Sequence, residues 1–97
     1  MNNNIEKLKK SGLGSLLIKK LEKIYQPSRR IDDVFKGNDI TFITNEKGEP
    51  VTLYIGKRLE NGVIKGDLFI RKIVRSPEGQ ILKSHWDNKG KVSTNNH

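Results

Sequence analysis

The chain of 97 residues contains no cysteine, only two histidines and a single tryptophan. Without cysteine there are no disulfide scaffolds, cysteine nucleophiles or thiolate metal sites. Two histidines alone do not make a structural zinc site, so we expect no metal and no cofactor. The longest apolar run, Leu16–Ile18, is far shorter than the roughly 20 residues that cross a bilayer. The polar residues 1–10 lack a signal-peptide pattern. We therefore expect no membrane span and a cytoplasmic location.

Apolar residues are also scarce, at 33% of the chain, while charged residues make up 31%. This length suits one small domain and leaves no room for two cores. We assign the domain to residues 13–92, preceded by a flexible polar leader or short helix over 1–12. Residues 93–97 are expected to form a disordered tail.

Positive charge exceeds negative charge, with 19 Lys and Arg against 11 Asp and Glu and a net charge of +8. Such a chain attracts nucleic acid, acidic proteins or anionic membranes. Basic residues are interspersed with acidic ones, and no block of five like charges occurs. Charge alone therefore selects none of these partners.

An amphipathic helix is predicted over residues 13–26, because apolar side chains recur there at helical spacing. The apolar stripe comprises Leu13, Leu17, Ile18, Leu21, Ile24 and Tyr25. Pro27 ends this pattern, since the residue before proline is disfavoured in helical geometry. Residues 28–39 are interpreted as a connector with one helical turn, which the spacing of Ile31, Val34 and Phe35 suggests.

From Ile40 onward the apolar period changes from 3.6 to 2, which predicts strands as far as residue 92. We therefore predict an α+β fold, an N-terminal amphipathic helix packed on a four-stranded antiparallel β-meander over residues 40–92. A small five-stranded, SH3-like barrel with an N-terminal helix is the alternative.

Two turns predict how the longest strands pair. Asn61-Gly62 is typical of a two-residue type I′ turn, which sets Leu53 opposite Ile70. Residues 76–79, Ser-Pro-Glu-Gly, suit a type I turn with a bulge, which sets Ile70 opposite Trp86. These registers gather one apolar face, formed by Val51, Leu53, Ile55, Leu59, Ile64, Leu68, Ile70, Val74, Leu82 and Trp86.

The other two turns are less informative. The turn at 45–48 leaves open whether Ile40 and Phe42, or instead Ile43, face the core. Residues 88–90 read as a last turn before a short edge strand.

The same registers define a second face, which carries the candidate binding residues. In this prediction Tyr54 lies beside Phe69, surrounded by basic side chains. The full candidate set is Tyr54, Arg58, Lys65, Phe69, Arg71, Arg75, Lys83 and His85. Aromatic rings stack on bases and cations contact phosphates, a combination typical of surfaces that bind RNA or single strands. The same face also suits a protein partner or a homo-oligomer, because aromatic cross-strand pairs stabilise sheets whatever they bind.

No set of residues forms a recognisable catalytic site. Gly12-Leu13-Gly14 lacks the third glycine of a dinucleotide fingerprint, and Gly56-Lys57 lacks the rest of a phosphate loop. His85 and Asp87 point to the same side of a strand, but no nucleophile can be placed beside them. We therefore expect no catalytic residues and a small non-enzymatic binding module. Nucleic acid is the favoured partner, and the alternative is an interaction or assembly protein, such as a bacterial or phage accessory protein.

Overall fold

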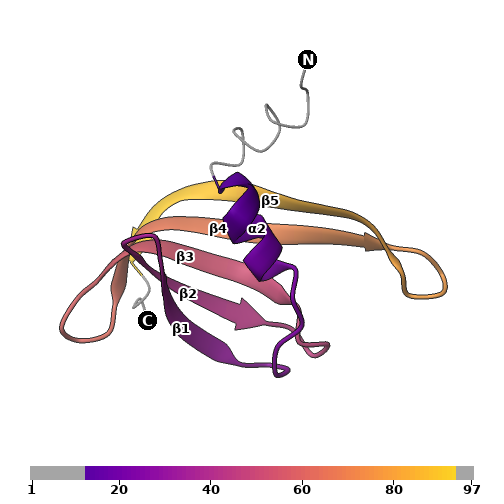
Figure 1. The fold of residues 1–97 in the computed structure, drawn as a ribbon, viewed down its shortest axis with the longest axis horizontal. Helices are drawn as coiled ribbons and strands as arrows, with labels where there is room; N and C mark the ends of the chain where they lie inside the picture. The colour runs from indigo at the N-terminus through magenta and orange to yellow at the C-terminus, as the bar shows by residue number, and fades with distance from the viewer. Residues whose placement is uncertain (1–12, 94–97) are drawn as a thin grey trace, which may run out of the picture.

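The computed structural model describes residues 13–93, and these form one short helix and a five-stranded sheet (Figure 1). The elements are α2 (Gly14–Leu21), β1 (Arg30–Phe35), β2 (Asn38–Thr44), β3 (Pro50–Arg58), β4 (Ile64–Arg75) and β5 (Ile81–Ser93). Each strand pairs antiparallel with the next, so the sheet is a meander of order β1-β2-β3-β4-β5. The leader predicted over 1–12 and residues 94–97 of the predicted tail lie outside the described residues.

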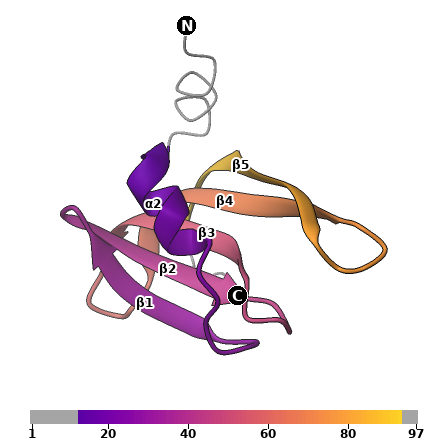
Figure 2. The same cartoon turned by 45° about the vertical axis from the view of Figure 1, so that its right-hand side comes forward.

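The helix packs on one face of the sheet, which we call the helix face; the opposite side is the open face (Figures 1 and 2). Leu17 and Leu21 of α2 are buried because they lie one helical turn apart on the same side. The buried core consists of Leu13, Leu17, Leu21, Ile40, Phe42, Leu53, Phe69 and Trp86. The turn at 45–48 therefore sends Ile40 and Phe42 to the core, one of the two registers that the sequence leaves open.

The helix ends at Leu21, and the prediction that it continues to residue 26 is wrong. Tyr25 instead fixes the chain where it leaves the helix. Its backbone N–H donates to Gly48 O at 2.8 Å, and its hydroxyl donates to Lys20 O at 2.8 Å. Its ring meets Phe42 edge-on at 4.9 Å. The apolar spacing of Tyr25 thus reflects packing of a loop residue on the core.

Residues 30–35 form a strand, so the predicted connector with a helical turn is wrong and the meander has five strands rather than four. Strand β1 pairs with β2 through a two-residue turn in which Lys36 has φ 50° and Gly37 has φ 83°. Two positive φ values are the mark of a type I′ turn. Among the described strands β1 and β5 form the two edges and do not pair, so the sheet is not closed into the alternative barrel.

The β3–β4 hairpin turns at Asn61-Gly62, but its loop has three residues rather than two. Leu59 N–H donates to Val63 O at 2.7 Å, and Gly62 has φ 88°. This is the geometry of a type I turn followed by a glycine bulge. Leu53 therefore faces Phe69 rather than Ile70, and Tyr54 faces Leu68 rather than Phe69.

The β4–β5 hairpin begins as predicted, because Ser76 N–H donates to Gln80 O at 2.8 Å. The register then shifts between Val74 and Arg75, which sets Arg71 opposite Trp86 and Ile70 opposite Asp87. A one-residue change of register exchanges the two faces of a strand. The change at the β3–β4 loop therefore inverts β4 relative to the prediction. The second change, between Val74 and Arg75, returns β5 to its predicted orientation. Phe69 and Arg71 thus lie on the helix face, and Leu68 and Ile70 lie on the open face.

The sheet departs from regular strand geometry at two further places, one inside β5 and one between β3 and β4. The last turn predicted at 88–90 is a bulge inside β5, where Gly90 has φ 96° and donates its N–H to Asn88 Oδ1. Gly56 and Gly66 lie directly opposite each other, and a Cβ on Gly56 would stand 2.1 Å from Lys65 O. A side chain at either glycine would collide with the neighbouring backbone, so the pair permits a close approach of β3 and β4.

Candidate functional site

The structure separates the eight candidate residues. Tyr54, Arg58, Lys83 and His85 belong to the open face. Phe69 and Arg71 point toward the helix and are only 2% and 8% exposed. Lys65 and Arg75 share the side of β4 that carries Phe69, because they stand at odd positions of the same strand. The predicted aromatic pair is therefore not formed, and half of the predicted basic cluster leaves the surface to which it was assigned.

Four half-buried side chains fill the middle of the open face, and we call them the apolar centre: Ile43, Tyr54, Leu68 and Ile70. They stand in two adjacent cross-strand rows. One row runs Thr41, Tyr54, Leu68, and the next runs Ile43, Thr52, Ile70, Asp87. The rows are contiguous, so the apolar centre is one continuous strip across β2, β3 and β4.

Arg58 organises the charged groups on the β1 side of this strip. Its guanidinium donates to Thr41 Oγ1 and to Ile40 O, both at 3.0 Å, and lies 3.3 Å from Asp32 Oδ1. Its backbone N–H donates to Asp39 Oδ2 at 2.7 Å. All these contacts hold Arg58 against its own sheet, so its charge is largely occupied within the chain.

Asp32 shares this network and is kept ionised by it. Partial burial opposes the charged carboxylate, but the hydrogen bond from Thr41 and the charges of Arg30 and Arg58 outweigh burial and lower the pKa of Asp32. Asp33 points to the other side of β1 and lies 2.7 Å from Lys20 of the helix, and this hydrogen bond lowers the pKa of Asp33. The adjacent carboxylates thus point to opposite faces of β1, as successive residues of a strand do.

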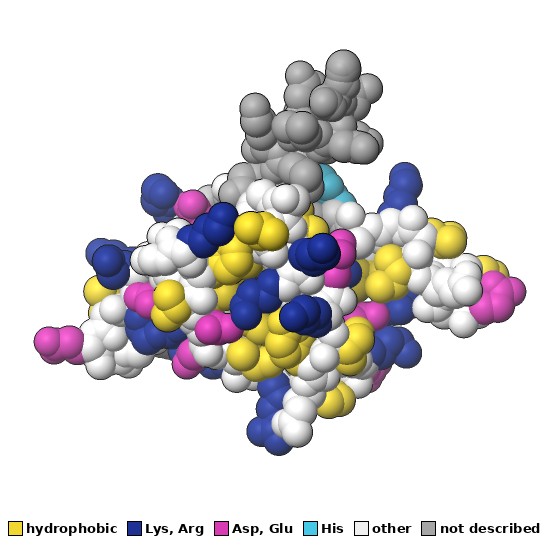
Figure 3. All heavy atoms as spheres, in the orientation of Figure 1, with side chains coloured by type: hydrophobic (Ala, Val, Ile, Leu, Met, Phe, Trp, Pro, Cys, Tyr) yellow, Lys and Arg dark blue, Asp and Glu magenta, His cyan; other side chains and the backbone are white. Residues whose placement is uncertain are grey.

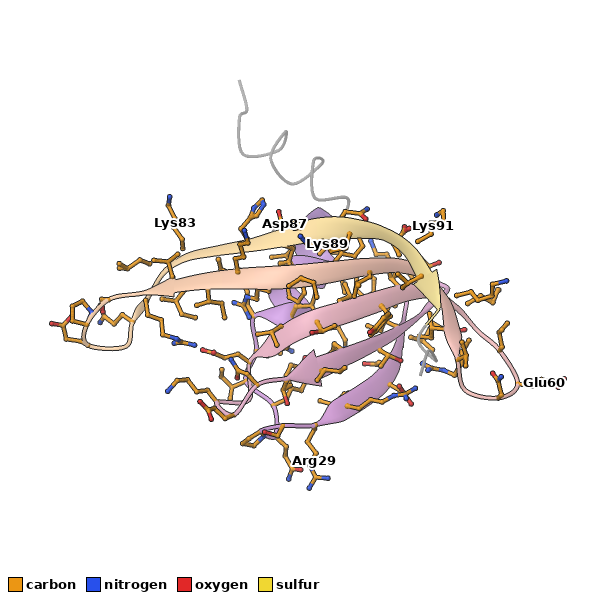
Figure 4. The ribbon with its side chains drawn as sticks, turned by 180° about the vertical axis from the view of Figure 1, so that it is seen from behind. Arg29, Glu60, Lys83, Asp87, Lys89 and Lys91 are labelled. Atoms are coloured by element: carbon orange, nitrogen blue, oxygen red, sulfur yellow. The ribbon has the colours of Figure 1, made fainter. Side chains whose placement is uncertain are left out.

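On the β5 side of the strip, one carboxylate lies near a histidine and a lysine. Asp87 Oδ1 lies 2.6 Å from His85 Nε2, and Asp87 Oδ2 lies 4.0 Å from Lys72 Nζ. Lys83 forms no ion pair within residues 13–93. Figure 4 views the open face and shows Lys83, Asp87, Lys89 and Lys91 following one another along β5. The two sides of the strip therefore differ. On the β1 side Arg30 and Arg58 are paired with Asp32, whereas on the β5 side Lys83 has no ion-pair partner among the described residues.

Arg71 serves the helix face rather than a ligand. Its guanidinium donates to Pro50 O at 3.1 Å, to Leu21 O at 3.4 Å and to Ser84 Oγ at 2.6 Å. It also lies 5.8 Å from the Trp86 ring centroid, within cation–π range. Leu21 ends the helix, so this buried cation joins the helix C-terminus to β3 and β5.

Nearby, Glu49 and Arg75 form a second polar contact on the flank of the sheet. Glu49 is 5% exposed and accepts hydrogen bonds from Arg75 and from Asn45 Nδ2. Burial raises its pKa, but these hydrogen bonds and the charges of Arg75 and Arg71 prevail and lower the pKa of Glu49 overall. Arg75 is therefore also engaged within the chain.

Sequence reasoning missed Leu68, Ile70 and Lys72 as residues of this face and left the side of Ile43 open. Their exposure follows from the inversion of β4 and from the register of β2. Neither feature can be predicted from the type of any single residue. One signal was present: a three-residue loop containing Asn61-Gly62 is as compatible with the turn residues as a two-residue loop. Within residues 13–93 no cluster of acidic or histidine side chains forms a metal site, and no helix there is long and apolar enough to cross a membrane.

Comparison of the chain with protein-family models, with curated proteins and with solved structures found no match.

Proposed function

We propose that the chain is a non-enzymatic binding module that recognises a protein partner through the open face. The observation that carries this proposal is the apolar centre, a continuous strip of half-exposed side chains on a sheet face that no described element covers. Protein interfaces have an apolar middle and a polar rim. Here polar contacts flank the strip on both sides, an ion pair at Arg58–Asp32 and a contact of 2.6 Å between His85 and Asp87.

The contacts of the candidate residues favour a polypeptide over a nucleic acid. Stacking on bases requires aromatic rings, and Tyr54 is the one ring left in the apolar centre once Phe69 lies beneath the helix. In the paired rows of the open face the Lys and Arg residues are Arg30, Arg58, Lys72 and Lys83, against three carboxylates, Asp32, Asp39 and Asp87, and Lys89 at the β5 bulge adds one more cation. This face alone thus offers a nucleic-acid backbone little excess charge.

Nucleic-acid binding is the second candidate, and the lysines along β5 favour it. Lys83 and Lys89 form no ion pair within the described residues, and the whole chain carries a net charge of +8. A single strand that follows β5 would contact these lysines and reach Tyr54 and His85 on the open face. Its affinity would fall steeply with salt, because phosphate contacts release counterions.

Selection from a random peptide library, followed by amide chemical-shift mapping, tests the proposal. We expect selected peptides to shift the amides of Ile43, Tyr54, Leu68 and Ile70 more than those of the helix. Tyr54→Ala and Leu68→Asp should each weaken binding about tenfold or more, as substitutions at the middle of an interface do. Leu16→Asp is the matched control, since Leu16 lies on the exposed side of α2 and is 56% exposed.

Thermal melts of each variant separate lost binding from lost folding. Shifts confined to the helix or to the β3–β4 loop would contradict the proposal. Binding of a single-stranded oligonucleotide to the same amides, with no peptide selected, would replace it by the second candidate.

A further inference from the structure

The β4–β5 hairpin extends beyond the rest of the sheet as a two-stranded ribbon (Figures 1 and 2). Pairing between β3 and β4 ends at Ile70, while β4 and β5 remain paired as far as Arg75 and Ile81. We call residues 72–85 the arm. A two-stranded ribbon in water is marginal on its own, because neither of its faces is covered.

We infer that the partner segment is acidic and that it lies along the open side of this arm, between Lys72 and Lys83. The inference rests on the proposed function and specifies the chemistry of the partner. On this side of the arm Lys72 stands opposite His85, and Val74 stands opposite Lys83. The pair next to them, Ile70 and Asp87, joins the arm to the apolar centre.

Charge complementarity determines the sign of the charge that the partner carries. Each carboxylate of the open face is already in contact with a donor of this chain: Asp32 with Thr41 and arginines, Asp39 with the Arg58 N–H, and Asp87 with His85. Lys72 has only a long contact of 4.0 Å to Asp87, and its side chain is 73% exposed. Lys83 forms no ion pair among the residues that the structure describes. The charge left to be neutralised is therefore positive.

The apolar groups on the arm indicate that the acidic partner also carries hydrophobic side chains. Val74 is 50% exposed, stands directly opposite Lys83 and lies one row further along the arm than Lys72. A segment that alternates acidic and apolar residues would neutralise the lysines and cover Val74 together, which a chain of phosphates would not do.

A second copy of this chain fits the arm poorly. The net charge of +8 repels another copy, and this repulsion is strongest where both copies present lysines. We therefore commit to a different, acidic polypeptide as the occupant.

Three synthetic peptides of equal length test this inference on the full chain. One alternates Leu with Glu, one alternates Leu with Lys, and one is polyglutamate; an oligonucleotide of equal negative charge is added for comparison. We expect the Leu–Glu peptide to bind most tightly and to shift the amides of Lys72, Val74 and Lys83. The double variant Lys72→Glu, Lys83→Glu should weaken this binding about tenfold or more, since charge reversal turns attraction into repulsion. The double variant Lys19→Glu, Lys23→Glu, with both exposed lysines on or just after the helix, is the charge-matched control and should change little.

The outcomes distinguish this inference from the proposed function. Peptides that bind the apolar centre regardless of charge, and regardless of the double variant, would overturn the inference and leave the proposed function standing. Failure of every selected and synthetic peptide to shift the open face would overturn both. Tighter binding of polyglutamate or of the oligonucleotide than of the Leu–Glu peptide would show that charge alone is recognised, and would also overturn the inference.

Discussion

A buried arginine at the middle of the helix face is the residue on which the helix and the sheet converge. Arg71 is 8% exposed, and burial lowers its pKa, with the charge of Glu49 opposing that effect. Its guanidinium donates to two carbonyl oxygens, that of Pro50 and that of Leu21, the last residue of the helix. Removing a cation from such a site leaves buried acceptors unsatisfied, which costs more than the arginine itself contributes.

We therefore predict that Arg71→Ala lowers the free energy of unfolding by about 2–4 kcal/mol. Lys72→Ala, one residue along on the exposed side of the same strand, should change it by less than about 0.5 kcal/mol. Urea unfolding followed by tryptophan fluorescence measures both, because Trp86 lies against Arg71. Equal stability of the two variants would show that Arg71 is not a structural link.

Glu49 makes stability depend on acid pH in a way that can be assigned to one side chain. Its pKa is lowered in the folded chain, so the folded state holds the proton less tightly than the unfolded state does. The stabilising contribution is complete above the usual glutamate pKa of about 4.3 and is lost as pH falls through the lower folded pKa. We predict that Glu49→Gln reduces the loss of thermal stability between about pH 6 and pH 3. Part of that loss should remain, because Asp32 and Asp33 also have lowered pKa values. Parallel pH profiles of the variant and the parent chain would contradict the assignment.

Among the elements, strands β3 and β4 are joined by a contact that only glycine permits. A Cβ on Gly56 would lie 2.1 Å from Lys65 O and 2.7 Å from the Cα of Gly66, and both obstacles are backbone atoms. Backbone cannot move aside as a flexible side chain does. We predict that Gly56→Ala destabilises the fold by about 1–3 kcal/mol, the usual cost of overpacking. Lys57→Ala, the exposed neighbour, is the control, and thermal melts that show no difference would mean that the sheet relaxes freely at this point.

The elements also show what the sequence could and could not predict. The helix face of β3 and β5 follows from apolar periodicity, and Trp86 is buried as expected, whereas the orientation of β2 was left open by the sequence. Strand β4 carries apolar residues at both parities, with Leu68 and Ile70 on one side and Phe69 and Ile73 on the other, so its orientation depended on loop length alone. The β3–β4 loop contained one residue more than the simplest turn, which inverted β4, and the register shift between Val74 and Arg75 then changed its pairing with β5.

Two further elements were beyond pattern reasoning for different reasons. In β1 the apolar residues Ile31 and Phe35 are four apart, a spacing that a strand and a helical turn share. At the end of the helix Tyr25 keeps helical spacing although the chain has left the helix. As a result, the structure brings only half of the candidate residues to one surface: Tyr54, Arg58, Lys83 and His85 share the open face, but the four candidates on β4 do not.

At the scale of the whole molecule, the described residues form two layers, a sheet and one short helix on one of its sides. The two edges of the sheet differ in how they resist pairing with another strand. At β1 the Val34 N–H is occupied by Asp33 Oδ1 at 2.8 Å. At β5, lysines at 83, 89 and 91 line the strand, and charged edges oppose pairing with another sheet. Figure 3 shows that acidic and basic side chains are interspersed on the helix side, without a patch of one sign. The open face thus remains the surface most suited to association.

The helix face requires its cover, and this leads to a prediction for the molecule as a whole. Among the described elements, α2 alone lies over Phe42, Leu53, Phe69 and Trp86. A chain that begins at Ser28 would expose this apolar surface and lose the acceptor that Arg71 finds at Leu21. We predict that it aggregates or fails to fold, as exposed apolar surfaces of this kind do.

A matched pair of variants in the full chain tests the same cover without a truncation. Leu17 is 2% exposed and Leu16 is 56% exposed, although they are neighbours on the same helix. Leu17→Asp places a charge in the core and should lower the free energy of unfolding by more than about 3 kcal/mol. Leu16→Asp should change it by less than about 0.5 kcal/mol. Size-exclusion chromatography and thermal melts measure both variants and the shortened chain. A shortened chain that stays monomeric, with a cooperative melt, would show that the sheet is stable alone and that the helix is free to serve as a second contact surface.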